Sequence, residues 1–206
     1  MLDPYTSLAM KSTNVTRIMN LVDQSERFKR QGHVGGVLWF TGLPASGKKT
    51  LAHLLETRLF NLGYQVIAFD SVWLRKGLTS DLKFCRLDRK ENIRRAGELA
   101  ALLSGSGLIV ITAFISPYVE DRAVAREMNN NFHEIYLDVP IEICEARDQR
   151  NRYKRAHLGE LTNFTGVSAP YEKPLNPNIV LEGSVLTKHE CVDYLVDYVN
   201  HNFKSA

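Results

Sequence analysis

The sequence predicts an α/β fold in which a parallel β-sheet is flanked by helices on both faces. Three observations indicate this class. Short apolar runs alternate with segments of helical periodicity, a glycine-rich turn joins the first strand-like run to a helix, and 206 residues are enough for one domain with a sizeable core. Strands that alternate with helices pair in parallel, so ligands are expected beyond the carboxyl ends of the strands.

The first half of the chain contains two predicted strands and two predicted helices. Residues 37–41 form a continuous apolar run, typical of a strand buried on both faces, and residues 65–69 form a second run. Residues 48–62 have helical periodicity and are expected to end at Gly63, and residues 88–105 form the next helix. Their apolar stripes are Leu51, Leu54, Leu55 and Leu59, then Ile93, Ala96, Leu99 and Leu103.

The second half contains three further predicted strands, at residues 108–114, 133–137 and 179–181. A helix is expected to begin at Ile141. The last helix opens with a capping box, Thr187-x-x-Glu190, and its inward residues are expected to be Val192, Leu195, Val196, Val199 and Phe203. In a parallel sheet four turns should open onto one edge, those after Thr41, Phe69, Phe114 and Leu137.

Two segments lack clear periodicity. Residues 1–35 are predicted to be an N-terminal extension, with weak helical patterning around Ile18, Leu21 and Val22, so that one domain covers residues 36–206. Residues 149–176 are rich in Arg, Lys, Asn, Gly and Pro. Because a loop of this length in a compact domain is usually functional, we expect a lid at about residues 149–168. An ordinary surface loop is the alternative.

Composition excludes several classes of protein. The net charge of +3 is too small to indicate binding to nucleic acid or to a membrane surface, and the most apolar run is too short to span a bilayer. The N-terminus lacks the apolar core of a signal peptide, and the 3 cysteines are widely spaced, as expected in a reducing compartment. The 6 histidines show no ligand spacing. We therefore expect a cytoplasmic protein without a structural metal site.

The glycine-rich turn has the pattern of a phosphate-binding P-loop. It lies between a predicted strand and a predicted helix, and its residues are Gly42, Leu43, Pro44, Ala45, Ser46, Gly47 and Lys48. The glycines allow backbone N–H groups to surround a phosphate, the helix N-terminus adds partial positive charge, and the lysine can reach the β- and γ-phosphates of ATP. The alternative is a strand-to-helix turn with an incidental lysine.

One residue beside this loop departs from the motif. The residue after the lysine is normally Ser or Thr, whose hydroxyl binds Mg²⁺, but here it is Lys49. An ammonium group cannot coordinate a metal ion and repels one. Thr50 is the next residue, but one helical step turns its side chain by about 100°.

Several further segments carry a family resemblance. They are Asp88-Arg89-Lys90-Glu91-Asn92-Ile93-Arg94-Arg95, the run Thr112-Ala113-Phe114-Ile115-Ser116-Pro117-Tyr118, Cys144-Glu145-Ala146-Arg147-Asp148, Tyr153-Lys154-Arg155-Ala156, and Asn163-Phe164-Thr165-Gly166 followed by Pro170-Tyr171-Glu172. In this order and spacing, from about Asn14 to the last helix, they resemble the adenylyl-sulfate (APS) kinase family. The resemblance implies a P-loop kinase fold, a homodimer, ATP with Mg²⁺, and transfer of the γ-phosphate to the 3′-hydroxyl of APS to form PAPS in sulfate assimilation.

The resemblance also implies roles for individual residues. Lys48, Asp70 and Ser116 are the expected catalytic residues, and the P-loop with Lys49, Thr50 and Arg147 is expected to bind ATP. The expected APS-binding residues are Arg75, Phe84, Arg89, Asn92, Ile115, Lys154 and Phe164. Aromatic faces suit a flat base and guanidinium groups suit phosphosulfate oxygens. The alternatives are that Phe84 or Phe164 belongs to the core, and that Arg89, Arg94 and Arg95 form a solvated helix face.

The segment after the second strand departs from the family pattern. The family has Asp-Gly-Asp-Asn-x-Arg, whereas this chain has Asp70-Ser71-Val72-Trp73-Leu74-Arg75. The first Asp and the Arg remain, but the second carboxylate, which could orient a hydroxyl or hold Mg²⁺ through water, is Val72.

Three functions therefore stay open. The first is an APS kinase, with ATP sulfurylase as a further expected partner. The second is a kinase-like module that binds nucleotide without transferring phosphate. The third is a kinase for another nucleotide-like acceptor, because Trp73 and Lys83 change the expected pocket wall.

Overall fold

Five parallel strands form the centre of the molecule, in the order β2-β3-β1-β4-β5. The structure is a computed structural model that describes residues 22–183 and 185–204. The strands are β1 (Gly36–Thr41), β2 (Val66–Asp70), β3 (Ile109–Ala113), β4 (Phe132–Asp138) and β5 (Ile179–Glu182). Each of the five predicted strands is confirmed to within one residue at either end.

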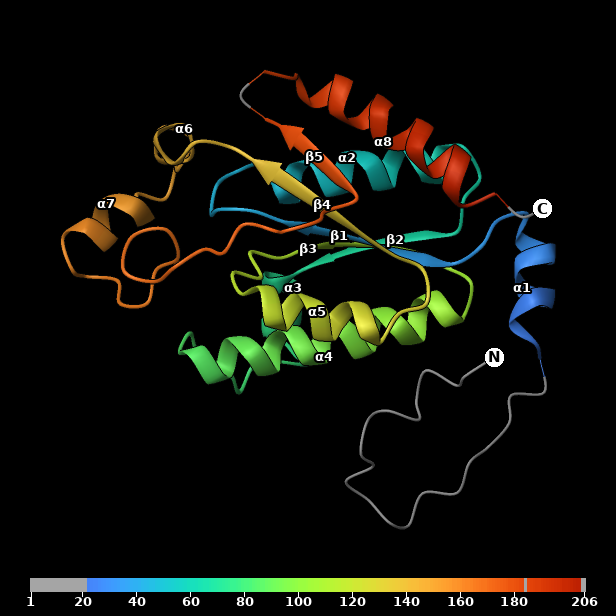
Figure 1. Cartoon of the computed structure of the whole chain (residues 1–206), viewed down its shortest axis with the longest axis horizontal. Coiled ribbons are helices and arrows are strands. Elements are labelled where there is room, and N and C mark those ends of the chain that lie inside the picture. Colours follow the sequence, from blue (N-terminus) through green and yellow to red (C-terminus); the bar gives the residue numbers. More distant parts are fainter. Residues whose placement is uncertain (1–21, 184, 205–206) are drawn as a thin grey trace, which may run out of the picture.

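Helices cover both faces of this sheet (Figure 1), as the predicted fold class requires. In chain order they are α1 (Gln24–Gln31), α2 (Lys48–Asn61), α3 (Ser71–Arg75), α4 (Arg86–Gly105), α5 (Val119–Glu127), α6 (Ile141–Ala146), α7 (Arg152–His157) and α8 (Lys188–Asn202). In Figure 1, α2 and α8 lie on one face, α4 and α5 lie on the other, and α6 and α7 lie beyond the arrowheads of β4 and β5. None of these helices combines the length and apolar character that crossing a lipid bilayer requires, within the residues described.

The core consists of two layers separated by the sheet. All six residues of β1 are buried because helices cover both of its faces. Leu38 and Phe40 belong to the layer under α2 and α8, whereas Val37 and Trp39 belong to the layer against α4. This alternation from one face to the other follows from the two-residue period of a strand.

Most predicted helix faces are confirmed, with three corrections. Leu54, predicted to be part of the inward stripe of α2, is 37% exposed, and Leu99 and Leu103 of α4 are only half-buried. The stripe that contacts the sheet is narrower than the apolar pattern, because Ala96 and Ala100 bring α4 close to the strands. The predicted capping box at Thr187 is present, and the five inward residues predicted for α8 and its end are all buried.

Four helices, α1, α3, α5 and α7, were not predicted from the sequence. α1, α3 and α7 are short, and five of the nine residues of α5 are charged. A signal for α5 was nevertheless present, because Glu120 and Asp121 lie in its first turn and Arg126 in its last, which suits the helix dipole.

The predicted N-terminal extension contacts the last helix. His33 forms an antiparallel bridge with Lys204, and the N–H of Val34 donates to the carbonyl of Phe203 over 2.8 Å. Ile18 and Leu21, which carried the weak helical pattern, lie outside the described residues. The domain boundary at residue 36 stays a prediction.

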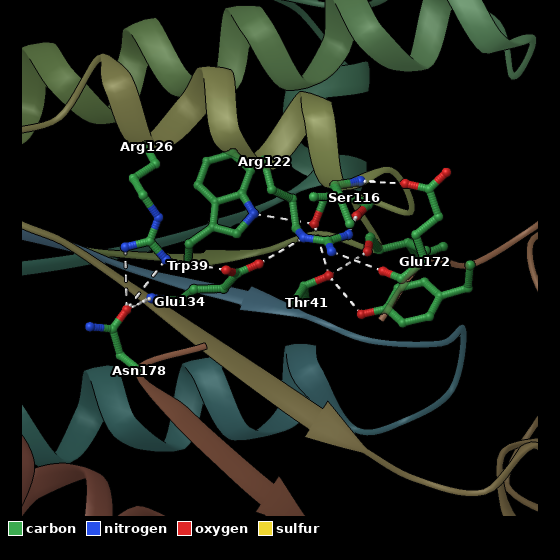
Figure 2. A network of polar contacts seen from close by, with 11 residues as sticks. Trp39, Thr41, Ser116, Arg122, Arg126, Glu134, Glu172 and Asn178 are labelled. Carbon is green, nitrogen blue, oxygen red and sulfur yellow. Dashed lines mark hydrogen bonds and ion pairs between the residues drawn. The ribbon is translucent and has the colours of Figure 1, made fainter. Parts of the chain in front are cut away.

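A buried ion pair links β4 to α5 (Figure 2). The Nε of Arg122 donates to Oε1 of Glu134 over 2.7 Å, and the two side chains are only 3% and 9% exposed. Two further Arg122 nitrogens donate to the carbonyl of Ser116 (2.6 Å) and to the carbonyl of Glu172 (2.8 Å). One guanidinium group therefore joins β4, the turn after β3 and the segment that leads into β5.

Substitution of Glu134 tests this buried pair. Glu134→Ala leaves the Arg122 charge buried without its carboxylate, so the free energy of unfolding should fall by about 3–5 kcal/mol in urea denaturation. Glu127→Ala is the matched control, because Glu127 is an exposed carboxylate of α5, and its effect should stay within about 0.5 kcal/mol. Equal effects of the two substitutions would contradict this assignment.

Candidate active site

The carboxyl ends of the strands bring the predicted segments to one edge of the sheet. The hydroxyl of Thr41, at the end of β1, donates to the carbonyl of Ile115 after β3 over 2.8 Å. A side chain at Gly42 would lie 2.8 Å from the carbonyl of Leu137 in β4. The P-loop thus begins between two neighbouring strands, and only glycine allows this close approach.

The P-loop has the backbone that its sequence predicts. Gly42 and Gly47 have φ values of 148° and 100°, which favour glycine. Ala45 has a φ of 60°, a left-handed conformation that costs energy in a non-glycine residue. The N–H of Ser46 donates to the carbonyl of Leu43 over 3.2 Å. The turn is therefore tight, and α2 begins directly at Lys48.

The Lys48 side chain folds back over the loop. Its Nζ donates to the carbonyls of Gly42 (2.8 Å) and Leu43 (2.6 Å) and to the hydroxyl of Ser46 (3.1 Å). Burial lowers the pKa of Lys48 to about 7. A phosphate anion would offer this nitrogen a stronger acceptor than the neutral carbonyls do, because hydrogen bonds between charged groups are stronger.

Lys49 and Asp70 form an ion pair across the edge. Nζ of Lys49 lies 2.7 Å from Oδ2 of Asp70, so the first turn of α2 contacts the end of β2. The other oxygen, Oδ1, accepts the N–H of Trp73 over 2.7 Å and caps α3. Burial by itself would raise the pKa of Asp70, but the hydrogen bonds from Lys49 and from the Trp73 backbone hold it below its ordinary value.

Arg89 joins two of the predicted APS-binding segments. Its Nε donates to the carbonyl of Phe84 over 3.0 Å, and Nη2 donates to the carbonyl of Asn163 over 2.6 Å. Phe164 is the next residue, so the segments that carry both predicted aromatic rings lie beside one guanidinium group. Arg94 and Arg95 differ from Arg89, because both form ion pairs with Glu91 of α4, and Arg95 also pairs with Asp81 before α4. The solvated-face alternative is therefore right for Arg94 and Arg95 alone.

Phe84 is not a core residue. It is 56% exposed, and the guanidinium carbon of Arg75 lies 4.3 Å from the centre of its ring. The Arg75 guanidinium also donates to the carbonyls of Leu82 (2.7 Å) and Lys83 (3.1 Å). Nearby in sequence, Asn92 is buried and its Oδ1 has no hydrogen-bond partner among the described residues. Arginine now covers a ring face that a flat base could occupy, and Asn92 offers a free acceptor.

The predicted lid packs into a small hydrophobic cluster that it shares with residues outside the lid. Within it, α7 places Tyr153 at 2% exposure, against Val139 and Cys144. The ring centres of Tyr153 and Phe164 lie 5.0 Å apart, and the Tyr153 hydroxyl donates to the carbonyl of Pro44 over 2.9 Å. Phe164 is therefore half-buried, and a single tyrosine connects it to the P-loop.

Ser116 lies inside the polar network of Figure 2. Its hydroxyl donates to the hydroxyl of Thr41 (3.0 Å) and accepts the indole N–H of Trp39 (3.2 Å), and it is only 2% exposed. Its φ of 39° is unusual for serine, and strained backbone of this kind is common at functional sites. In this arrangement Ser116 shapes the turn after β3, while its catalytic role stays a prediction.

Three other predicted site residues are exposed. Arg147, after α6, donates to the carbonyl of Gly183 over 2.9 Å, Lys154 lies on α7, and Thr50 lies on α2. Their roles in binding stay predictions. Ile115 is half-buried beside Thr41.

A cleft of about 910 Å³ lies beside the P-loop on the β4–β5 side. Leu43 contributes to its wall, and the rings of Tyr136 and Tyr171 stack there with centres 6.1 Å apart. None of the predicted APS-binding residues lines this cleft. The sequence analysis did not select Tyr136 or Lys173 for the site, and it quoted Tyr171 only as part of a family segment. No spacing rule marks these residues, since only the fold brings them together.

Comparison with known proteins agrees with the geometry. The family model for adenylylsulphate kinase matches residues 34–182. An adenylyl-sulfate kinase of Clostridium acetobutylicum is 47% identical over 193 residues, which cover 93% of this chain and 96% of that protein. An adenylyl-sulfate kinase of Thermodesulfovibrio yellowstonii is 44% identical over 94% of this chain and 98% of that protein.

A solved structure shares the fold as well as the sequence. The Mycobacterium tuberculosis APS kinase CysC, in complex with AMPPNP and APS, superimposes with a TM-score of 0.78 and is 38% identical, covering 81% of this chain and 98% of that chain. The chain therefore belongs to the adenylyl-sulfate kinase family of ATP-dependent phosphotransferases.

Proposed function

We propose that this chain transfers the γ-phosphate of ATP to the 3′-hydroxyl of APS, with the triphosphate on the P-loop and APS beside Phe84 and Phe164. One set of contacts carries the proposal. The carbonyl of Pro44 in the P-loop accepts the Tyr153 hydroxyl, Tyr153 packs on Phe164, and Arg89 spans from the segment of Phe164 to Phe84. A donor site and an acceptor site are thereby joined at one edge of the sheet.

Among the described residues, the two arginines of the proposed acceptor site form hydrogen bonds only with neutral groups. Arg75 and Arg89 donate to backbone carbonyls. Phosphosulfate oxygens would replace neutral acceptors with charged ones, which strengthens the hydrogen bonds. The adenine would stack on Phe84 in place of the Arg75 guanidinium.

The chemical step needs positioning more than covalent chemistry. The 3′-oxygen of APS forms a bond to the γ-phosphorus, the bond from that phosphorus to the β–γ bridging oxygen breaks, and ADP leaves with the bond electrons. The proton of the hydroxyl passes to Asp70, which its lowered pKa keeps in the ionised form that can take up a proton. Lys48 and the α2 N-terminus stabilise the charge that develops on the phosphate oxygens.

Magnesium is implied by the family, but the residues of this chain do not fit a protein-held Mg²⁺. Lys49 replaces the hydroxyl ligand, its ammonium occupies Oδ2 of Asp70, and Val72 replaces the second carboxylate. The charge stabilisation proposed above therefore uses only groups of the chain.

Two observations favour the rival functions. The Lys49–Asp70 pair would suit a module that binds nucleotide without transferring phosphate, because it occupies a carboxylate needed for the reaction. Trp73, which is 62% exposed, and the exposed Lys83 would suit a different acceptor. A homodimer, an association with ATP sulfurylase, a cytoplasmic location and the absence of nucleic-acid partners remain predictions from the sequence.

Direct measurement of the product tests the function. The purified chain should form PAPS from ATP and APS, and Phe84→Ala should weaken APS binding by about 1–3 kcal/mol, the value of a base stacked on an aromatic ring. Arg95→Ala should leave APS binding unchanged, because Arg95 is paired with Asp81 and Glu91 on the surface. Nucleotide binding without any PAPS would support the non-transferring module, and phosphorylation of a different nucleotide would support the third function.

The pKa of Lys48 gives a second test. With the loop empty this pKa is about 7, and bound phosphates should raise it, so above pH 7 the loop takes up a proton as ATP binds. Affinity for ATP should therefore fall as the pH rises from about 7 to 9. Calorimetry in two buffers of different ionisation enthalpy should detect the uptake at pH 8. Lys48→Ala gives the proton uptake that comes from ATP itself. Equal proton uptake by both proteins would refute the assignment of this proton to Lys48.

A further inference from the structure

The first turn of α2 holds two lysines and no carboxylate. Lys48 lies over the P-loop, as described above, and is nearly buried. Lys49 points elsewhere, because its side chain is 61% exposed and its ammonium reaches the end of β2. A helix N-terminus disfavours cations, so this placement needs a compensating anion. Asp70 supplies one such anion, at 2.7 Å.

The ammonium of Lys49 stands between the two elements that would support a metal ion. A hydroxyl at the second position of α2 and the carboxylate that ends β2 would be its neighbours on the protein side. Here the first is a nitrogen without a lone pair. Oδ2 of Asp70 lies in an ion pair with Lys49, and Oδ1 accepts the N–H of Trp73. Val72, 52% exposed, brings no oxygen from its side chain. The positively charged ammonium of Lys49 therefore lies where a metal ion would be expected.

We propose that Lys49 is a built-in cation that replaces Mg²⁺ as the charge partner of the triphosphate, so that this chain binds metal-free ATP as tightly as Mg²⁺-bound ATP. The inference rests on the proposed function for the place of the triphosphate. When ATP enters, its terminal phosphates compete with Asp70 for the exposed ammonium of Lys49. The shift releases Oδ2 of Asp70, the oxygen that would accept the proton of the attacking hydroxyl.

The ordinary effect of Mg²⁺ makes this inference measurable. A chain with a metal site gains from Mg²⁺, whereas a fixed ammonium at that site should repel the second cation. The affinity of the chain for ATP should therefore be the same with and without Mg²⁺, and this equality should depend on Lys49 alone.

Binding of ATP to the full chain, without APS so that no transfer occurs, tests the proposal by calorimetry in EDTA and in Mg²⁺. The wild-type affinities should agree within about threefold. In EDTA, Lys49→Ser should bind ATP about ten- to a hundredfold more weakly than the wild type, the value of a hydrogen bond between charged groups, and should recover with Mg²⁺. Lys76→Ser is the matched control, since it removes an exposed cation just after α3, and it should behave as the wild type does.

A second variant distinguishes the proposed effect on ATP binding from a loss of folding. Asp70→Asn removes the competitor of the phosphates for Lys49, so metal-free ATP should bind more tightly than to the wild type, and a misfolded variant would bind less. The proposal is overturned if the wild type binds ATP at least tenfold more tightly with Mg²⁺ than in EDTA, or if Lys49→Ser shows no dependence on the metal. PAPS formation separates the two hypotheses. Metal-indifferent binding without PAPS would leave this inference intact and remove the proposed function, and PAPS formation with metal-dependent binding would do the reverse.

Discussion

The buried charge of Arg122 is the constraint on which the edge of the sheet depends. A guanidinium group at 3% exposure must satisfy its donors inside the protein, and here it does so with Glu134, the carbonyl of Ser116 and the carbonyl of Glu172. Those three acceptors belong to segments that are distant in sequence. Because the Ser116 hydroxyl bonds to Thr41, which immediately precedes the P-loop, the network also determines where the P-loop begins.

The cations at and near this edge have two kinds of partner, carboxylates and neutral oxygens. Arg94, Arg95 and Arg122 are paired with carboxylates, so an incoming anion would have to displace a charged partner. Lys48 and Arg89 instead donate to neutral oxygens. The oxygens of an anion would form stronger hydrogen bonds in their place. These two side chains come from different elements, yet both approach the contacts that Tyr153 makes between the lid and the P-loop. This difference supports the proposal that anionic ligands bind beside Lys48 and Arg89.

Local patterns were sufficient for the strands, the P-loop and the last capping box, because each depends on residues close in sequence. The helix α5 was missed, since five of its nine residues are charged and its stabilising contact is the ion pair of Arg122 with a strand further along the chain. No apolar period runs through the lid segment, so its sequence does not indicate which residues are buried. Tyr153 is buried there by partners that only the folded chain brings together. Motif spacing can select Phe84 and Phe164, but it cannot show that Arg89 holds their segments side by side.

The pair of Lys49 and Asp70 shows why a departure from a motif has to be interpreted in three dimensions. In the sequence, Lys49 marks the loss of a metal ligand, and its ion-pair partner cannot be identified. In the structure, its ammonium is held by the carboxylate that would otherwise be buried with a single backbone partner, so the substitution and the retained Asp70 satisfy one another. A lysine held in this way brings one charge where Mg²⁺ brings two, and it cannot bridge two phosphate oxygens with fixed octahedral geometry. Because the lysine is part of the chain, its charge is present without prior binding of a metal ion. The exchange therefore favours binding of the triphosphate at low Mg²⁺ over stabilisation of the transition state, where the charge on the phosphate oxygens is spread and positioning matters most.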